Sequence, residues 1–187
     1  AFKSETARQY EAGLRYQPAD GRSLYSAAVF DLRRQNYLTY DANGIPRQTG
    51  DFSIHGLEME AMVSFLPRSN LTASYSYTPR AKVIASSNPA LVGTQPTAVP
   101  VNRASVWADH RYANGLKLGA GLRYEASTRG NDEGVPVKIP AYTVLDAMAG
   151  LDVGQWTLSL NILNLANKIY IANCTSIACY YGSPRLV

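Results

Sequence analysis

Apolar residues alternate with polar or small residues over long stretches of the chain. Between Trp156 and Ile162 every second side chain is apolar, and Thr157, Ser159 and Asn161 occupy the positions between them. The segment from Leu116 to Tyr124 follows the same rule. A repeat of two residues is typical of a β-strand, whose successive side chains point to opposite faces of a sheet. Eight such segments are present, and they predict an all-β protein.

The breaks between these segments alternate between short and long. Residues 18–22, 67–70, 113–115 and 153–155 form the short breaks, and residues 41–50, 84–100, 128–138 and 166–179 form the long ones. In an antiparallel meander every second connection lies at the same end of the sheet. The order therefore predicts tight turns at one end and long loops at the other, as in outer-membrane barrels with their short periplasmic turns and longer extracellular loops.

The two faces of the predicted strands differ in a way that favours a membrane barrel over a soluble antiparallel β domain, which stays the alternative. Aromatic residues stand near strand ends on the apolar face, as in the girdles at lipid interfaces: Tyr10, Tyr16, Phe65, Tyr75, Tyr77, Tyr112, Tyr124 and Trp156. The other face carries Glu11, Arg15, Glu58, Glu60, Lys117, Arg123, Asp146 and Asp152. An unpaired ion in a packed core costs several kcal/mol, whereas the lumen of a hydrated barrel accommodates it.

Length and composition agree with a membrane barrel. The predicted strands of 10 to 13 residues suit a tilted bilayer crossing, which needs about 9 to 11. The chain has 13 tyrosines beside 4 phenylalanines, and tyrosine favours a boundary between water and an apolar phase. No stretch approaches the roughly 18 apolar residues of a membrane helix. The net charge of +4 is not gathered in a polybasic run, which argues against nucleic acid as a partner.

Both ends of the chain suggest a portion of a larger barrel. No basic and apolar leader opens the sequence, so we expect an export signal to have been removed or to lie on another part of the molecule. After Gly182, the residues SPRLV begin a ninth strand, whereas bacterial single-chain barrels have an even number of strands.

One motif resembles a known family. The segment NLANKIY, from Asn164 to Tyr170, is similar to the signature Asn-Leu-Phe-Asp-Lys-x-Tyr near the carboxyl end of TonB-dependent outer-membrane receptors. Asn164, Leu165, Lys168 and Tyr170 match the signature, and Ala166 and Asn167 replace phenylalanine and aspartate. The segments QYEAGLRYQP, GLEMEA, IPAYTVLDAMAGLDV and NCTSIACYYGSPR follow one another as in the ferrichrome and ferric-hydroxamate branch. The resemblance covers essentially all 187 residues.

The resemblance implies a fold and a function. Residues 1–187 correspond to the carboxy-terminal portion of a barrel of 22 strands, roughly its last nine, while the plug domain and the TonB-contacting segment are absent from this chain. Such receptors lie in the bacterial outer membrane, bind a ferric siderophore at the extracellular face and import it with energy from TonB. The protein holds no cofactor of its own, and the ferric siderophore is the transported ligand. An outer-membrane structural or adhesive barrel that binds a partner through its loops is the alternative.

Cys174 and Cys179 lie in the last long connection, at the extracellular end, where oxidation is the expected state. A disulfide between them closes a ring around Thr175, Ser176, Ile177 and Ala178, and ferrichrome-type receptors similarly carry a disulfide in this loop. A zinc site is the competing interpretation, but it needs about four ligands, and His55 and His110 belong to distant strands. A redox role has little support, since the spacing is not Cys-x-x-Cys.

Tyr180 and Tyr181 follow the ring and are the candidate ligand contacts, because a phenol ring offers an apolar surface and a hydrogen bond. The competing interpretation is that both residues only pack the loop or belong to a girdle. Residues 84–100 are expected to fold over the bound ligand.

Catalysis and calcium binding have weaker support. Asp109 and His110 are adjacent, and neighbours on a strand face opposite sides, which argues against joint catalysis. The long loop after Gly121 carries acidic residues without the spacing of a known calcium site. We therefore expect neither a catalytic group nor a metal site.

Overall fold

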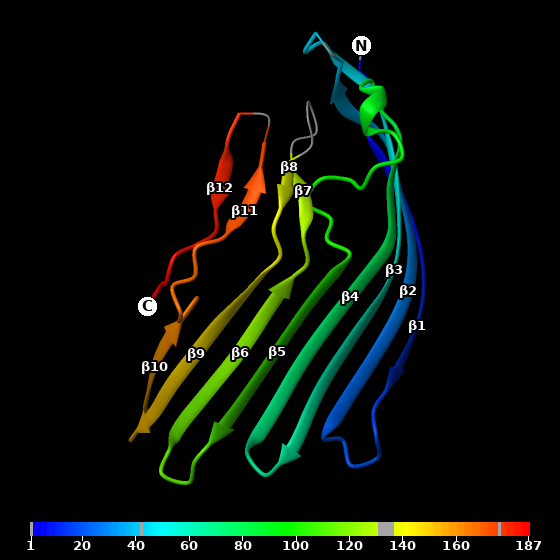
Figure 1. Ribbon diagram of the computed structural model, residues 1–187. Coiled ribbons are helices and arrows are strands. Elements are labelled where there is room, and N and C mark those ends of the chain that lie inside the picture. Colours follow the sequence, from blue (N-terminus) through cyan, green and yellow to red (C-terminus); the bar gives the residue numbers. More distant parts are fainter. Residues whose placement is uncertain (1, 42, 131–136, 176) are drawn as a thin grey trace.

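A computed structural model describes residues 2–41, 43–130, 137–175 and 177–187. Eight strands form one antiparallel sheet in the order β1-β2-β3-β4-β5-β6-β9-β10 (Figure 1). They are β1 (Thr6–Tyr16), β2 (Ser23–Tyr40), β3 (Pro46–Leu66), β4 (Ser69–Ala85), β5 (Asn102–Arg111), β6 (Leu116–Glu125), β9 (Tyr142–Val153) and β10 (Trp156–Ile162). The predicted meander of eight strands is confirmed, as a partial barrel wall that is open at β1 and β10.

Two small hairpins and one short helical turn lie at the upper end of the sheet in Figure 1. β7 (Thr128–Gly130) pairs with β8 (Val137–Ile139), and β11 (Ile171–Cys174) pairs with β12 (Cys179–Tyr181). The 3-10 helix η1 (Pro89–Leu91) interrupts the connection from β4 to β5. Part of what the sequence predicts as long loop is thus additional strand.

The tight turns lie together at the lower end of Figure 1, as predicted. Only Pro67 and Arg68 separate β3 from β4, and only Gly154 and Gln155 separate β9 from β10. Gly154 has φ 61° and Arg68 has φ 64°, the left-handed conformation that closes a short hairpin. All long connections lie at the opposite end, so the alternation of short and long breaks is confirmed.

The predicted strand length of 10 to 13 residues is wrong for several strands. β2, β3 and β4 have 18, 21 and 17 residues, and β10 has 7. The ladder between β2 and β3 continues up to the pair Tyr40 and Pro46, so the predicted break at residues 41–50 shrinks to 41–45. This upper extension mixes charged, amide and aromatic residues on the same face, as in the pair of Arg34 and Phe52, and for that reason alternation does not reveal it.

Residues paired across neighbouring strands share a face, and the register confirms the two predicted faces. Leu118, Ala149 and Leu160 form one cross-strand row on the face that we call the apolar face. Glu60 and Arg123 belong to one row on the opposite face, the polar face, with Ser74 and Ser105 between them. In these rows, apolar side chains therefore lie on one face of the sheet and charged or polar side chains lie on the other.

The apolar face becomes charged above the row of Tyr10, Asp31 and His55. Above this row, Arg33 donates hydrogen bonds to both carboxylate oxygens of Asp51, at 3.1 Å and 3.2 Å from Nε and at 2.6 Å from a terminal guanidinium nitrogen. Hydrogen bonding to this guanidinium lowers the pKa of the Asp51 carboxyl below its usual range. The length of the apolar band between this boundary and the turns suits a bilayer crossing, for which a tilted strand needs about 9 to 11 residues.

Few side chains are buried, because a single sheet has no second layer to cover it. The buried apolar residues are Ile54, Ala81, Val83, Leu91, Ile139, Val144 and Cys174. Most of them lie where the upper connections fold back on the polar face. Among the described residues, no helix has the length and apolar character needed to cross a membrane.

The last residues return to the free edge of β10. Leu163 and Leu186 form an antiparallel bridge, with N–H to O distances of 2.9 Å and 3.1 Å in the two directions. This bridge agrees with the predicted start of a ninth strand after Gly182.

Candidate functional site

The connection from β4 to β5 folds onto the polar face at the upper end of the sheet. The N–H of Val83 donates to the carbonyl oxygen of Thr94 at 2.8 Å, and the N–H of Thr78 donates to Val101 at 2.8 Å. The hydroxyl groups of Thr39 and Ser87 are 2.6 Å apart and tie the connection to β2. Residues 86–101 therefore form a wall that is bound to β2 and β4 at several points.

The upper pocket lies between this wall and the extensions of β2 and β3, and has a volume of about 370 Å³. Arg34, Tyr37 and Phe52 form one side of it. The Arg34 guanidinium carbon is 5.9 Å and 5.7 Å from the two ring centroids, and the rings themselves meet edge to face at 5.4 Å. Glu5, the residue before β1, forms an ion pair with Arg34 and holds the guanidinium in place.

The lower pocket lies on the other side of the same wall, closer to the barrel interior, and measures about 320 Å³. Phe30, Ile54 and Arg103 line it, and Val99 lines both pockets. Arg103 donates to the Glu125 carboxylate at 2.9 Å, which fixes its guanidinium. The two pockets, which we call the vestibule, are thus both lined by the wall, the upper one by residues between 94 and 99 and the lower one by residues 98–100.

The lining of the upper pocket suits the binding of a ligand. The upper pocket is lined by two guanidinium groups, Arg34 and Arg129, together with aromatic rings, hydroxyls and the amide of Gln95, and no carboxylate lines it. Such a surface binds apolar and aromatic groups and donates hydrogen bonds to oxygen atoms. The sequence alone does not mark Arg34, Phe52 or Arg129 as site residues. Their only signal was a stretch of charged and aromatic residues where the two-residue alternation ends.

Further segments complete the rim of the vestibule. The carbonyl oxygen of Arg129 in β7 accepts a hydrogen bond from the N–H of Ala98 at 3.0 Å. Gly130, next along β7, packs on the disulfide hairpin: a Cβ there would lie 2.6 Å from the Cβ of Cys174. The wall, the β7–β8 hairpin and the β11–β12 hairpin are therefore in direct contact, although they come from three different connections.

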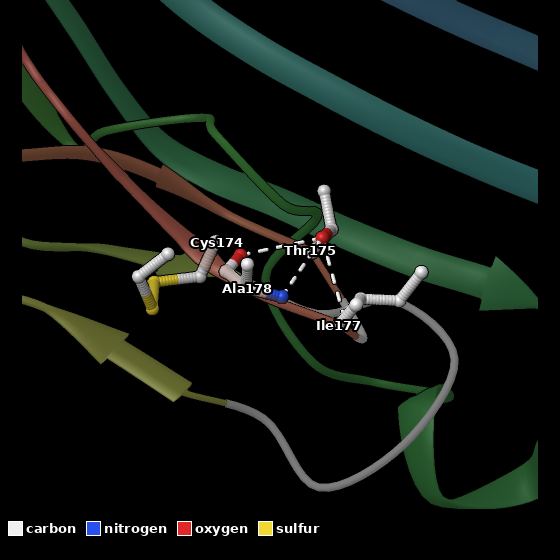
Figure 2. The surroundings of a disulfide bond; sticks show 5 residues. Cys174, Thr175, Ile177 and Ala178 are labelled. Carbon is white, nitrogen blue, oxygen red and sulfur yellow. Dashed lines mark hydrogen bonds between the residues drawn. A yellow bond between two sulfur atoms is a disulfide. The ribbon is translucent and has the colours of Figure 1, made fainter.

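The predicted disulfide between Cys174 and Cys179 is present at the tip of the β11–β12 hairpin (Figure 2). Inside the ring, the N–H of Thr175 donates to the carbonyl oxygen of Ala178 at 2.9 Å. The Thr175 hydroxyl oxygen accepts from the N–H groups of Ile177 and Ala178 at 3.4 Å each. Ser176, the remaining ring residue, lies outside the described residues. Ile177 is 93% exposed, so the ring presents an aliphatic side chain outward.

Reduction of this disulfide is expected to loosen the hairpin by about 2 kcal/mol, because the bond restricts the unfolded ring. Amide hydrogen exchange at residues 171–181 of the full-length receptor, with and without reductant, measures the effect. The amides of β5 and β6, which do not pack on the disulfide hairpin, serve as the internal control. Equal protection of residues 171–181 in both conditions would contradict the prediction.

Tyr180 and Tyr181 lie on β12 and are 56% and 74% exposed. Neither residue lines the upper or the lower pocket. Their role as ligand contacts stays a prediction, and the structure adds only that both rings stand on a hairpin in contact with the vestibule rim.

The family motif explains how this hairpin is held. Asn164 is 2% exposed and has φ 52°. Its side-chain amide donates to the carbonyl oxygens of Lys168 at 2.9 Å and Ser183 at 3.1 Å, and its oxygen accepts from the N–H of Lys168 at 2.8 Å. Its backbone N–H donates to the Asp146 carboxylate at 2.8 Å. Asn164 therefore joins β9, the motif and the returning end of the chain.

The rest of the motif packs on the polar face around Asp146. Arg123 donates to this carboxylate at 2.6 Å and 3.0 Å. Tyr170 stacks on Tyr142 with ring centroids 4.2 Å apart. A side chain at Gly182 would collide with the Tyr170 ring, so only glycine fits there. Asn164, Lys168 and Tyr170 thus act in the architecture of the hairpin.

The structure separates the other candidate groups. Asp109 lies on the polar face, 3.6 Å from the Lys117 ammonium, whereas the Nδ1 atom of His110 lies 2.7 Å from the Ser69 hydroxyl on the apolar face. The two residues face opposite sides, as predicted. In the part of the chain that the structure describes, no three His, Cys, Asp or Glu side chains form a metal-binding group. The acidic residues Asp132 and Glu133 of the long loop lie outside that part.

Comparison with known proteins places the chain in one family. Residues 1–165 match the model of the family described as TonB dependent receptor-like, beta-barrel. The ferrioxamine receptor of Yersinia enterocolitica is 34% identical over 199 residues, which cover 100% of this chain and 27% of that protein. The ferrichrome outer membrane transporter/phage receptor of Escherichia coli K12 is 31% identical over 198 residues, covering 100% of this chain and 26% of that protein.

A solved structure shares the fold. The ferric-catecholate import receptor Fiu from Escherichia coli K12, in its closed form, superposes with a TM-score of 0.78 at 23% identity, covering 98% of this chain and 27% of that chain. The chain thus spans about a quarter of the length of the proteins that it matches. With the family match over residues 1–165, the two-faced meander and the motif around Asn164, the chain belongs to the TonB dependent receptor-like β-barrel family of the bacterial outer membrane.

Proposed function

We propose that the chain is the carboxy-terminal portion of an outer-membrane receptor that binds a ferric siderophore at its extracellular face and imports it with energy supplied through TonB. The protein acts by selective binding and gated passage, without making or breaking a bond. Relatives named as ferrioxamine and ferrichrome receptors support a ligand of the hydroxamate type. In this proposal the apolar band contacts outer-membrane lipid and the polar face lines the barrel interior.

The upper pocket carries the proposal. It stands on the polar face, above the apolar band and at the end with the long connections, where a ligand from outside arrives first. Arg34 donates hydrogen bonds to the oxygen atoms around the iron, and Phe52 contacts the apolar parts of the ligand. Tyr180 and Tyr181 add exposed aromatic surface on the disulfide hairpin beside the rim, as outer contacts during entry.

The test uses the full-length receptor with Arg34→Ala and Phe52→Ala, and ferrioxamine B and ferrichrome as ligands. Each variant is expected to weaken binding by about tenfold or more, the loss typical of a central contact residue, and to slow uptake of radioactive iron. Tryptophan quenching measures the affinity. Tyr180→Ala and Tyr181→Ala are expected to lower affinity less, since neither residue lines a pocket.

Arg80→Ala and Phe65→Ala are the matched controls, because both residues are exposed and neither lines the vestibule. Unchanged affinity for both ligands in Arg34→Ala and Phe52→Ala receptors that reach the outer membrane would overturn the assignment of the upper pocket. Equal losses in the two controls would do the same.

An acidic patch on the polar face supports the expectation of a plug in the barrel. Glu11, Glu58 and Glu60 surround a pocket of about 330 Å³ on β1 to β3. Arg15 lines the same pocket but lies beyond ion-pairing distance, and within the described residues none of the three carboxylates has a cationic partner. Uncompensated carboxylates in a confined lumen favour a basic partner. We propose that this partner is a plug domain with arginine or lysine at this level.

A further inference from the structure

A groove of about 460 Å³ crosses the apolar face between β1 and β4. Its floor contains Ala27, Ala61 and Ala73, one from each of three adjacent strands. Tyr16, Tyr25 and Met59 form its walls, and the two tyrosine rings stack with centroids 6.4 Å apart. The volume falls within the about 300–1,000 Å³ of small-molecule sites, and the lining is mostly apolar. Small residues between large ones thus make a depression in the apolar face.

The position of the groove across the bilayer follows from its closeness to the strand ends. Tyr16 is the last residue of β1 and Tyr25 is the third residue of β2, so both stand next to the tight turn at residues 17–22. Tight turns lie at the periplasmic end of this kind of barrel. The opposite boundary of the apolar band, the row of Tyr10 and Asp31, is further up. The groove therefore lies in the periplasmic half of the bilayer.

A cation stands below the groove. Ala61 and Ala73 pair directly across the β3–β4 hairpin, whose turn contains Arg68. From Ala73 to the start of β4 the chain descends four residues, about 13 Å at roughly 3.3 Å per residue. Arg68 forms no ion pair within the described residues and lines a second pocket at the turns with Arg111. Arg68 thus stands in the turn below the strand pair that carries Ala61 and Ala73, beyond the lower end of the groove.

We propose that the groove binds one acyl chain of a phospholipid from the periplasmic leaflet, with its phosphate near Arg68. Given the membrane location in the proposed function, the occupant is an acyl chain because the lining of the groove is mostly apolar. It belongs to a phospholipid because the groove is in the periplasmic half, whereas lipopolysaccharide occupies the outer leaflet. The lipid is a bound component that remains with the receptor after extraction from the membrane, unlike the exchanging lipids around it.

Native mass spectrometry of the full-length receptor in mild detergent tests the proposal. Ala61→Leu together with Ala73→Leu fills the floor. Ala108→Leu together with Ala120→Leu is the matched control, since these alanines also pair directly across two strands on the apolar face, outside the groove. The wild type and the control are expected to retain one phospholipid per receptor, and the filled variant is expected to lose at least about tenfold in occupancy. Unchanged occupancy in the filled variant, an equal loss in the control, or retained lipopolysaccharide in place of phospholipid would overturn the proposal.

A second measurement needs no variant in the groove. A phospholipid with a photoreactive group midway along its acyl chain is mixed with the wild-type receptor in nanodiscs and activated by light. Labelling is expected to concentrate on the peptides that carry Tyr16, Tyr25 and Met59, and even labelling around the barrel would overturn the proposal. Arg68→Ala is expected to lower this labelling several-fold while leaving the receptor folded.

Discussion

Asn164→Ala is expected to loosen the end of β10 and the β11–β12 hairpin by about 3 to 5 kcal/mol. The substitution removes three hydrogen bonds to Lys168 and Ser183, each with a net contribution of about 0.5 to 1.5 kcal/mol, and it leaves buried partners unsatisfied. Alanine at position 164 must also adopt the left-handed backbone conformation at φ 52°, which costs about 1 to 2 kcal/mol of folding free energy. Amide hydrogen exchange at residues 163–186 of the full-length receptor measures the loss.

Asn167→Ala is the control for the backbone conformation. Asn167 has φ 50° but is exposed and makes one side-chain hydrogen bond, accepting from the N–H of Arg185 at 3.0 Å. This variant is expected to lose only about 1 to 3 kcal/mol. Equal protection in the Asn164→Ala and Asn167→Ala receptors would show that Asn164 does not hold the hairpin.

Asp146→Asn in combination with Asn164→Ala distinguishes a shared network from two separate contacts. The Asp146 carboxylate binds both Arg123 and the backbone N–H of Asn164. Asn164→Ala keeps this N–H but frees the backbone of residue 164 from its side-chain hydrogen bonds, so any coupling passes through the position of that backbone. Residues in one network show interaction energies of about 0.5 to 3 kcal/mol in a double-mutant cycle. We therefore expect the combined loss to differ from the sum of the two single losses.

Glu58→Lys with Glu60→Lys is expected to abolish energised uptake and to open the barrel to solutes. Both carboxylates lie in the acidic patch. If they form ion pairs with a basic plug segment, breaking such a pair weakens the docking of the plug by about 3 to 5 kcal/mol, before repulsion between like charges is added. If a basic plug segment docks there, iron uptake falls by about a hundredfold or more, and the cell becomes permeable to large antibiotics. Iron uptake and antibiotic sensitivity of cells with the full-length receptor are the measurements. Because Glu58 also lines the lower pocket, antibiotic sensitivity is the measurement that reports on the plug.

Glu58→Gln with Glu60→Gln removes the charge without repulsion and is expected to have an intermediate effect. Asp20→Lys reverses a charge in the turn below the sheet, away from the patch, and is expected to leave uptake and permeability unchanged. Normal uptake in the Glu58→Lys, Glu60→Lys receptor would contradict a basic partner at this patch.

Much of the fold could be predicted because alternation is a local property. Leu158 and Leu160 stand on one side of β10 whatever its neighbours are, since successive residues of a strand point to opposite faces. The order of short and long breaks likewise settles which connections share an end. The same reasoning failed above the apolar band, where Arg33 and Asp51 pair on a face that is apolar lower down. With charged and aromatic side chains mixed on one face, as in the pair of Arg34 and Phe52, β2 and β3 give no alternating signal there.

The candidate site was predicted only in part, for a similar reason. Cys174 and Cys179 are close in sequence, so their disulfide follows from local spacing and from the extracellular location. Arg34 and Phe52 pair across β2 and β3 and meet the wall at residues 86–101. No short stretch of sequence contains that neighbourhood, and Tyr180 and Tyr181, the predicted contacts, do not line the pockets.

The sequence by itself determined the all-β class, the two faces, the meander, the disulfide and the resemblance to TonB-dependent receptors, because each of these depends on residues near one another along the chain. Only the tertiary structure decided where the vestibule lies, which role Asn164 has and that the apolar face contains a groove. Each of those features is made by segments from different connections or strands. Their contacts depend on register and on the path of the loops, which the order of residues does not display.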